Sequence, residues 1–202
     1  MTNDVLTAMS PARLARLSTM LDRQDILDCI HRISRAIDRF DKDLFLSGYH
    51  DDAVIDAGAL VGNPGDVYDK GTELHEHGQI STLHYLLNHH CEIDIPSKTA
   101  HTETYFFYQG LNRDHTNWVG GGRYVDRLEL RDDEWRIAFR YTIMEWSGTI
   151  SANEVPLFEN ITDLHLNGTP CRERKDPSYR RPLINVRGMS SPDNVRELSK
   201  PR

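Results

Sequence analysis

The sequence predicts one α+β domain in which helices pack on a strongly curved antiparallel sheet, giving a cone that encloses a polar-lined pocket. Three observations favour this class. Helical periodicity is confined to the first 82 residues, four long stretches rich in β-branched and aromatic residues follow, and three consecutive glycines lie inside the third stretch. Helices followed by consecutive strands are typical of an α+β domain. We expect this domain to span residues 1–150.

The N-terminal third reads as helices. Isoleucines recur with a helical period over residues 22–40, which indicates one buried face. A weaker helix, MSPARLARLSTML, precedes this segment, and Asp41 is a predicted N-cap for a short helix ending near Ser47. We further expect a short strand over 53–57, a turn at GNPGD and a helix over 71–82.

Four strands are predicted after these helices, over residues 84–95, 99–109, 117–130 and 135–146. The connections IPSKT, GLNRDHT and RDDE are short and carry turn residues, so neighbouring strands should form an antiparallel meander. The run Gly120-Gly121-Gly122 permits a bulge or a sharp bend, because glycine weakens a flat strand. Residues 151–202 are interrupted by prolines and are predicted to be an extended strap, not a separate domain.

Composition narrows the function classes. The net charge of −7 divides into about −12 before Cys171 and about +5 from that residue onward. Because the basic tail lacks an aromatic stacking platform, we expect no nucleic-acid partner. We expect the positive segment 172–181 to lie on acidic protein surface instead. No apolar run is long enough for a membrane span, and the N-terminus lacks the layout of a secretory signal, so a cytoplasmic protein is predicted. Three widely spaced cysteines favour reduced thiols over a disulfide framework.

Two residues could carry acid–base chemistry. Asp38 lies at the flank of the apolar helix stripe, near the C-terminus of the helix, where a carboxylate opposes the helix dipole. His84 opens the first long strand, and strict alternation along HYLLNHHCEID places Asn88 on its face and His89 and Cys91 on the opposite, more apolar face. An imidazole oriented by a carboxylate is suited to act as a general base. Taken alone, each residue could equally belong to a solvated surface.

Other candidate sites are weaker. Substrate-binding residues are predicted among the polar and aromatic side chains of the sheet, namely Asn88, Tyr105, Trp118, Arg123 and Arg140. The run His75-Glu76-His77 lacks the spacing that places two histidines on one helix face, so no metal is expected. No phosphate-binding loop or nucleophile elbow is present, and we therefore expect no cofactor. Cys91 is predicted to be a core residue.

Four passages together resemble the SnoaL-like branch of the nuclear transport factor two superfamily: DILDCIHRISRAIDRFDKDLF, HYLLNHHCEID, GGGRYVDRLELRDDEWRI and AFRYTIMEW. The resemblance implies a cone-shaped α+β barrel. Scytalone dehydratase, ketosteroid isomerase, hexachlorocyclohexane dehydrochlorinase and bile-acid dehydratase share that fold, as do the non-catalytic β-subunits of ring-hydroxylating dioxygenases. The dehydratase and dehydrochlorinase members look closest, and their paired aspartate and histidine correspond by motif position to Asp38 and His84. Ile33 stands where bile-acid dehydratase has a tyrosine.

These observations predict a cofactor-independent lyase. His84 would remove a proton from a small, largely apolar substrate, aromatic substrates included, and Asp38 would orient the imidazole. The same two residues could catalyse elimination of water, of halide or of an aldehyde. Two alternatives stay open: an isomerase or cyclase using the same base, and a non-catalytic subunit in which Asp38 and His84 would not touch. The resemblance also implies a homo-oligomer, with a trimer ahead of a dimer.

Overall fold

The computed structural model describes residues 9–150, 163 and 165–188. The chain divides into two compact units, Met1–Ala152 and Asn153–Arg202, and each is described by itself. The second unit contains two short 3₁₀ helices, Glu173–Lys175 and Pro177–Tyr179, with Asp176 capping the second. The predictions that 151–202 form a strap, and that its basic segment lies on acidic surface, stay predictions.

One continuous helix, α2 (Pro11–Arg39), replaces the two predicted helices. No glycine or proline interrupts residues 12–39, so nothing in the sequence breaks the helix. Ser10 caps its N-terminus, and Phe40 ends it in a left-handed conformation with φ of 52°. The predicted isoleucine stripe is buried, with Ile26, Ile30 and Ile33 at 0–1% exposure. The predicted cap of the next helix is confirmed, because the side chain of Asp41 accepts from the Leu44 amide at the start of α3 (Lys42–Leu46).

The segment predicted as a turn at GNPGD is the start of a helix. Helix α4 runs over Pro64–Gly78, with Asn63 as N-cap and proline in its first turn. This cap with an adjacent proline is a helix-start signal. The predicted helix over 71–82 is therefore wrong at both ends, since α4 begins earlier and Gln79 already belongs to strand β3.

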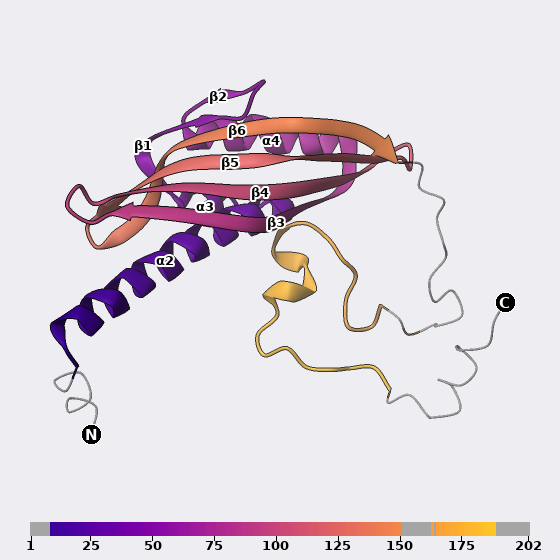
Figure 1. Cartoon of the computed structure of the whole chain (residues 1–202). Helices are drawn as coiled ribbons and strands as arrows, with labels where there is room; N and C mark the ends of the chain where they lie inside the picture. The colour runs from indigo at the N-terminus through magenta and orange to yellow at the C-terminus, as the bar shows by residue number, and fades with distance from the viewer. Residues whose placement is uncertain (1–8, 151–162, 164, 189–202) are drawn as a thin grey trace. The chain divides into compact units, whose positions relative to one another are not determined.

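Six strands form one curved, unclosed sheet in the order β2-β1-β6-β5-β4-β3 (Figure 1). Their bounds are Tyr49–Asp56 (β1), Val61–Gly62 (β2), Gln79–Asp94 (β3), Thr99–Asn112 (β4), Asn117–Arg131 (β5) and Glu134–Ile150 (β6). The meander from β3 to β6 is antiparallel as predicted. Strand β1, however, pairs with β6 in parallel, so the sheet is mixed. A parallel neighbour needs a crossover connection, here the long segment from β1 to β6 through β2, α4, β3, β4 and β5.

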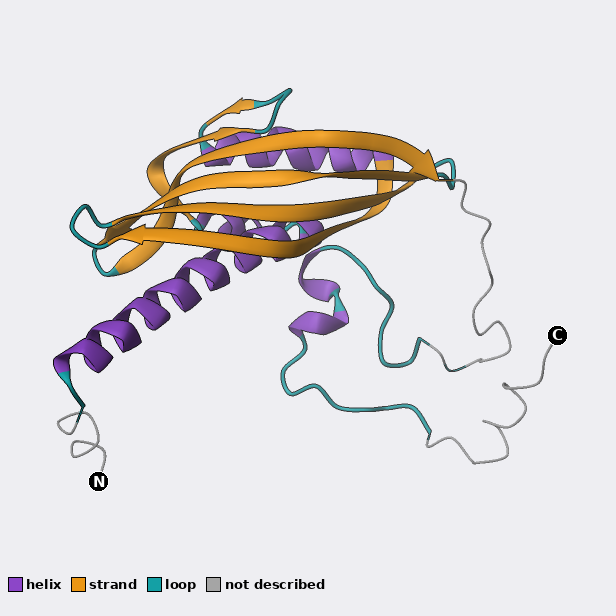
Figure 2. Ribbon diagram, viewed as in Figure 1, coloured by secondary structure: helices purple, strands orange, loops and turns teal. Residues whose placement is uncertain are grey.

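The predicted distortion at the triple glycine is confirmed. Between Gly121 and Gly122 the pairing with β6 shifts by one residue, which places a bulge on β6 at Glu145. A side chain at Gly122 would collide with the backbone carbonyl of Ile143, so the close approach of the two strands requires glycine there. The long strands bend together over the helices in Figure 2.

Helix α2 covers the free edge of β3 with side-chain hydrogen bonds. Arg23 Nη1 donates to the Cys91 carbonyl at 2.7 Å, and Ser34 Oγ donates to the His84 carbonyl at 2.9 Å. Asp38 Oδ2 accepts from the His84 amide at 2.9 Å. An edge strand otherwise presents unpaired backbone groups. These bonds therefore fix the long helix against the strand that carries His84.

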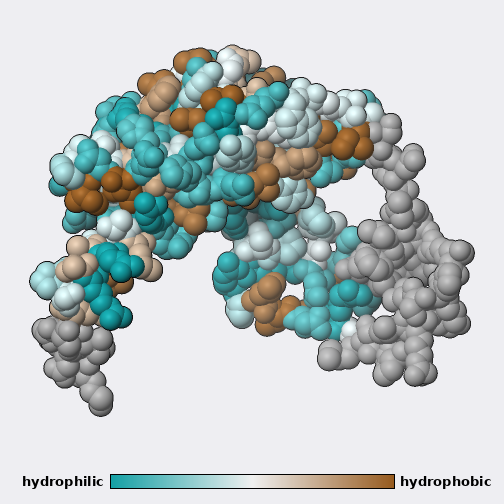
Figure 3. All heavy atoms as spheres, viewed as in Figure 1, coloured by the Kyte–Doolittle hydropathy of each residue, from teal (hydrophilic) through white to brown (hydrophobic). Residues whose placement is uncertain are grey.

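Three further features concern membrane-spanning helices, the cysteines and the exposed aromatic residues. Among the described residues, no helix is long and apolar enough to cross a membrane. Cys29 and Cys91 are buried and Cys171 is exposed, all as free thiols, so the core position predicted for Cys91 is confirmed. Apolar groups are scattered among polar ones over the strands in Figure 3, and the exposed aromatic residues of the sheet include Tyr85, Tyr141 and Trp146.

Candidate active site

Asp38 and His84 form a hydrogen-bonded pair, as the sequence predicts. Asp38 lies in the last turn of α2, and His84 lies near the start of β3. The distance from His84 Nδ1 to Asp38 Oδ1 is 2.6 Å, and the two side chains are only 9% and 11% exposed. The second carboxylate oxygen accepts from the backbone amide of His84 at 2.9 Å. Asp38 thus holds both the ring and the backbone of the same residue.

These two contacts determine the tautomer of His84. A carboxylate oxygen accepts hydrogen bonds, so the ring nitrogen at 2.6 Å must carry the hydrogen. In the neutral ring the lone pair then lies on Nε2. Among the described residues Nε2 has no hydrogen-bond partner. The pair therefore presents a basic nitrogen whose orientation is set from behind by a buried carboxylate.

A second polar group lies next to the pair and was not predicted from the sequence. Gln79 Oε1, at the start of β3, accepts from the Tyr108 hydroxyl at 2.8 Å and contacts His75 Nδ1 at 2.7 Å. Because an amide oxygen only accepts, His75 also carries its hydrogen on Nδ1. The rings of His75 and Tyr108 lie 6.0 and 4.8 Å from that of His84, measured between centroids.

Sequence reasoning missed this group for a topological reason. Its members come from three elements, with His75 on α4, Gln79 on β3 and Tyr108 on β4. The available signal was the run of histidines near His75, which the metal-spacing test discarded because it considers one helix face alone. The pairing of His84 with Tyr108 across the β3–β4 register brings the aromatic ring to the site.

Trp118 is the predicted binding residue that lies nearest to this group. It is the second residue of β5, is 40% exposed, and meets the Tyr108 ring edge-on at 5.3 Å between centroids. Tyr108 and Trp118 therefore form an aromatic wall beside His84, with Trp118 accessible to solvent. An exposed indole next to a basic imidazole is suited to contact an apolar ligand.

Arg140, another predicted binding residue, is instead part of the core. It pairs with Asp126 through two hydrogen bonds of 2.7 Å each, and both side chains are buried. Although burial opposes its charge, the carboxylate of Asp126 raises the pKa of Arg140 above its ordinary value. The guanidinium also lies 4.3 Å from the centroid of the Tyr124 ring. Burial is the main cause that raises the pKa of Tyr124 to about 12. With its charge satisfied inside the protein, Arg140 stabilises the sheet.

Tyr105 and Arg123 lie on the opposite face of the sheet from His84. The strand β4 alternates, and Thr104, Phe106 and Tyr108 are buried while Tyr105 is 41% exposed. Arg123 is paired with Tyr105 across β4 and β5 and is held by Glu103 at 2.9 Å and Glu145 at 2.6 Å. Both residues are thus on the outer face, away from the Asp38–His84 pair, because a strand turns successive side chains to opposite faces.

Asn88 is also displaced from the site, and the cause is a bulge. The β3–β4 pairing passes from Leu86 opposite Phe106 to His89 opposite Thr104, so β3 has one extra residue in this interval. The alternation reverses after the bulge. Asn88 is exposed, whereas His89 and Cys91 turn to the same side as His84. The predicted face assignment beyond Leu86 is therefore wrong.

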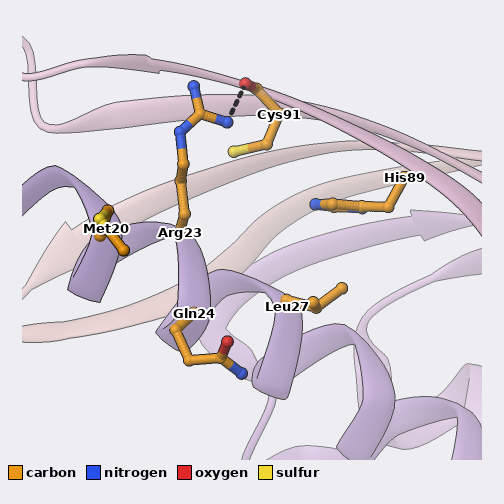
Figure 4. Close-up of a pocket in the computed structure, with 6 residues that line it drawn as sticks. All are labelled: Met20, Arg23, Gln24, Leu27, His89 and Cys91. Carbon is orange, nitrogen blue, oxygen red and sulfur yellow. Dashed lines mark hydrogen bonds between the residues drawn. The ribbon is translucent and has the colours of Figure 1, made fainter.

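A cavity of about 300 Å³ lies between α2 and β3 (Figure 4). Its lining residues are Met20, Arg23, Gln24 and Leu27 from the helix and His89 and Cys91 from the strand. It contains neither Asp38 nor His84. The placement of the Asp38–His84 pair in the main cavity stays a prediction. Within the described residues no three His, Cys, Asp or Glu side chains are arranged to hold a metal ion.

Comparisons with known proteins identify the family and agree with the fold. The family described as a SnoaL-like domain matches residues 18–141. The hexachlorocyclohexane dehydrochlorinase LinA-type3 of Novosphingobium barchaimii LL02 has a TM-score of 0.62 at 16% identity, covering 70% of this chain and 99% of its own. A scytalone dehydratase-like protein of Novosphingobium aromaticivorans has a TM-score of 0.57 at 14% identity, covering 69% and 96%. No curated protein matches the sequence. At these identities the structural likeness establishes the fold, which is the α+β fold predicted from the sequence.

Proposed function

Because the chain belongs to the SnoaL-like domain family, we propose that it is a cofactor-independent lyase in which His84 removes a proton from a small, largely apolar substrate. The observation that carries the proposal is the buried 2.6 Å contact between His84 Nδ1 and Asp38. It leaves Nε2 as the base and holds the ring in one tautomer. The same contact argues against the non-catalytic alternative, which requires the two side chains to lie apart.

The proposed step is an elimination. His84 Nε2 takes a proton from the carbon next to the leaving group, the C–H electron pair forms a double bond, and the leaving group departs with its own electron pair. Asp38 stabilises the imidazolium that forms, without itself taking the proton. General-base catalysis of this kind contributes about 10²–10⁴-fold. Orientation against Tyr108 and Trp118 would supply a further part of the rate.

His75 gives the site a second proton-transfer group. Loss of halide needs no acid, but loss of hydroxide requires a proton on the leaving oxygen. Because Gln79 accepts from the Nδ1–H of His75, an acid role would require a doubly protonated ring, which would give the Nε2 proton to the leaving oxygen and become neutral. Its ring lies 6.0 Å from that of His84, which is a separation suited to a base and an acid acting on one small molecule. This arrangement favours dehydration within the lyase class.

The proposal is tested with a panel of substrates in D₂O. Hexachlorocyclohexane would report halide loss, scytalone would report dehydration, and deuterium uptake without elimination would report an isomerase. We expect a product from one member of the panel and its loss in His84→Gln. The matched control is His90→Gln, an exposed histidine on the same strand that contacts Glu92. Normal turnover in His84→Gln would overturn the proposal.

The role of His75 has its own test. His75→Gln places a side-chain amide, which can still donate to Gln79, at the position and removes the titrating group. We expect it to slow dehydration by about tenfold to a hundredfold and to leave halide elimination nearly unchanged. Equal losses on both substrates would instead assign His75 to positioning of Tyr108 and Gln79.

A further inference from the structure

The outer face of the sheet, which carries Tyr105 and Arg123, has no helix packed on it. The helices of the first unit lie on the inner face, and none of the described elements of that unit covers the outer one (Figure 2). Five aromatic side chains of this outer face are 38–51% exposed, namely Tyr85, Tyr105, Phe139, Tyr141 and Trp146. A contiguous exposed apolar surface on a protein marks a place where another molecule binds.

Three aromatic rings on this face form a row across the meander. The ring centroids of Tyr85 on β3 and Phe107 on β4 are 6.1 Å apart, and those of Phe107 and Trp146 on β6 are 6.0 Å apart. Strand β5 lies between β4 and β6 and contributes Gly121 at this level. A Cβ atom added to Gly121 would lie only 2.5 Å from the indole Nε1, so the indole lies directly on the backbone of β5. The aromatic row is therefore continuous over all four strands.

The bulge on β6 determines that Trp146 belongs to this row. Met144 pairs with Gly122 on the inner face, and strict alternation would turn Trp146 to the same inner face. Because Glu145 is the extra residue of the bulge, Trp146 pairs with Gly121 and turns outward. Glu145 also points outward, since its carboxylate accepts from Arg123 Nε at 2.6 Å. The bulge thus adds an aromatic side chain to the outer face and removes one from the inner face.

The area of this aromatic face matches that of a contact between two copies of one chain. Each of the five exposed rings presents about 80–100 Å² to solvent, because a whole aromatic side chain has roughly 200 Å². Together they present about 400–500 Å², and the partly exposed Phe107 and Ile143 add to this sum. A standard interface buries about 800 Å² on each side, of which about 65%, or roughly 500 Å², is apolar in homodimers.

The charges on this face are already paired within the chain. Arg123 lies 2.9 Å from Glu103 and 2.6 Å from Glu145, and its guanidinium is 6.0 Å from the centroid of the Tyr105 ring. Arg127 pairs with Glu129 on the same face. A second copy could therefore cover the aromatic row without burying an unpaired charge. The carboxylates beside Tyr105 also disfavour nucleic acid, which would otherwise suit exposed aromatic rings.

We propose that this outer face packs against the same face of a second copy of the chain, with the row of Tyr85, Phe107 and Trp146 at the centre of the contact. A two-fold axis that runs along the strands at Phe107 would place Tyr85 of each copy opposite Trp146 of the other, so that each exposed ring gains an aromatic contact. Such a contact produces a dimer, in place of the trimer that the family resemblance favours. The proposal is independent of the lyase activity, because the Asp38–His84 pair lies on the inner face.

The mass of the full chain in solution tests the proposal. Sedimentation equilibrium should give twice the chain mass of 23.3 kDa. Tyr85→Arg should raise the dissociation constant of the dimer about a hundredfold or more, because it places a charge in the apolar centre of the contact. Leu74→Arg is the matched control, since Leu74 is an exposed apolar residue on α4, away from the sheet, and the dissociation constant should not change.

A second measurement needs no substitution in the contact and decides the result even if Tyr85→Arg fails to fold. In ¹⁹F NMR of the chain labelled with 5-fluorotryptophan, dilution should shift the signal of Trp146 and leave those of Trp118 and Trp135 unchanged.

Four results would overturn the proposal: a monomer at about 100 μM, a trimer, a dimer that Leu74→Arg weakens as much as Tyr85→Arg does, or a dilution shift confined to Trp118. His84→Gln separates the two proposals, since it should abolish turnover and leave the dimer intact.

Discussion

Substitution of Asp38 by asparagine should separate the chemical role of the carboxylate from its structural role. The carboxylate accepts two hydrogen bonds from one residue, from His84 Nδ1 at 2.6 Å and from the His84 amide at 2.9 Å. An asparagine has one acceptor oxygen and one donor amide. If its oxygen keeps the backbone bond, its NH₂ group faces Nδ1 and requires that nitrogen to be unprotonated. The ring hydrogen then moves to Nε2, where the proposed base would be.

The magnitude follows from the number and kind of bonds. Hydrogen bonds to a charged group contribute about 1.5–3 kcal/mol each, against about 0.5–1.5 kcal/mol for neutral ones. Asp38→Asn keeps two bonds but makes both neutral, so we expect a stability loss of about 2 kcal/mol. Asp38→Ala removes both bonds from a buried pair and should cost about 3–5 kcal/mol. Turnover should fall by about 10³-fold or more in either variant, because asparagine moves the ring hydrogen onto Nε2 and alanine removes the group that orients the ring and stabilises the imidazolium.

Three measurements check these values. Urea unfolding gives the stability of each variant, and imidazole ¹⁵N shifts report which nitrogen of His84 carries the hydrogen. The rate is measured on the substrate identified in the D₂O panel. The double variant Asp38→Asn with His84→Gln should be scarcely slower than either single variant, since the two groups act as a unit. An Asp38→Asn protein with near-normal turnover, or with His84 still protonated on Nδ1, would refute this reasoning.

Three further predictions concern the sheet and its titrating groups. Arg140→Met should destabilise the fold by about 3–5 kcal/mol by leaving Asp126 charged, buried and unpaired, and adding Asp126→Leu should restore much of that loss in urea unfolding. Gly122→Ala should abolish or severely reduce folding because of the Ile143 carbonyl, whereas Gly148→Ala, which meets nothing within 4 Å, should not lower the melting temperature. His50 has its pKa lowered chiefly by burial, so only its unfolded form takes up a proton just below about pH 6.5. Stability should therefore fall with acidification below that pH, and less steeply in His50→Gln; equal slopes in thermal melts would contradict this.

Local sequence patterns were sufficient to predict several elements of the fold, although not the start of α4 or the continuity of α2. The isoleucine period predicts the buried face of α2, and the cap at Asp41 predicts α3. Turn residues between four strand-like stretches predict the β3–β6 meander. These signals act within a few residues, so they are readable without tertiary information. The same logic explains the errors, because the parallel pairing of β1 with β6 depends on residues about 90 positions apart.

The candidate site, too, was predicted from the sequence only in part, and the rest depends on the tertiary structure. The Asp38–His84 pair could be predicted because the order and spacing of its motifs resemble those of a known family, and the 2.6 Å contact agrees with that prediction. The neighbours of the pair could not be predicted. Asn88 and His89 exchange faces because of one bulge, and a single extra residue reverses strand alternation beyond it. His75, Gln79 and Tyr108 meet only because the β3–β4 register and the position of α4 bring three separate segments together.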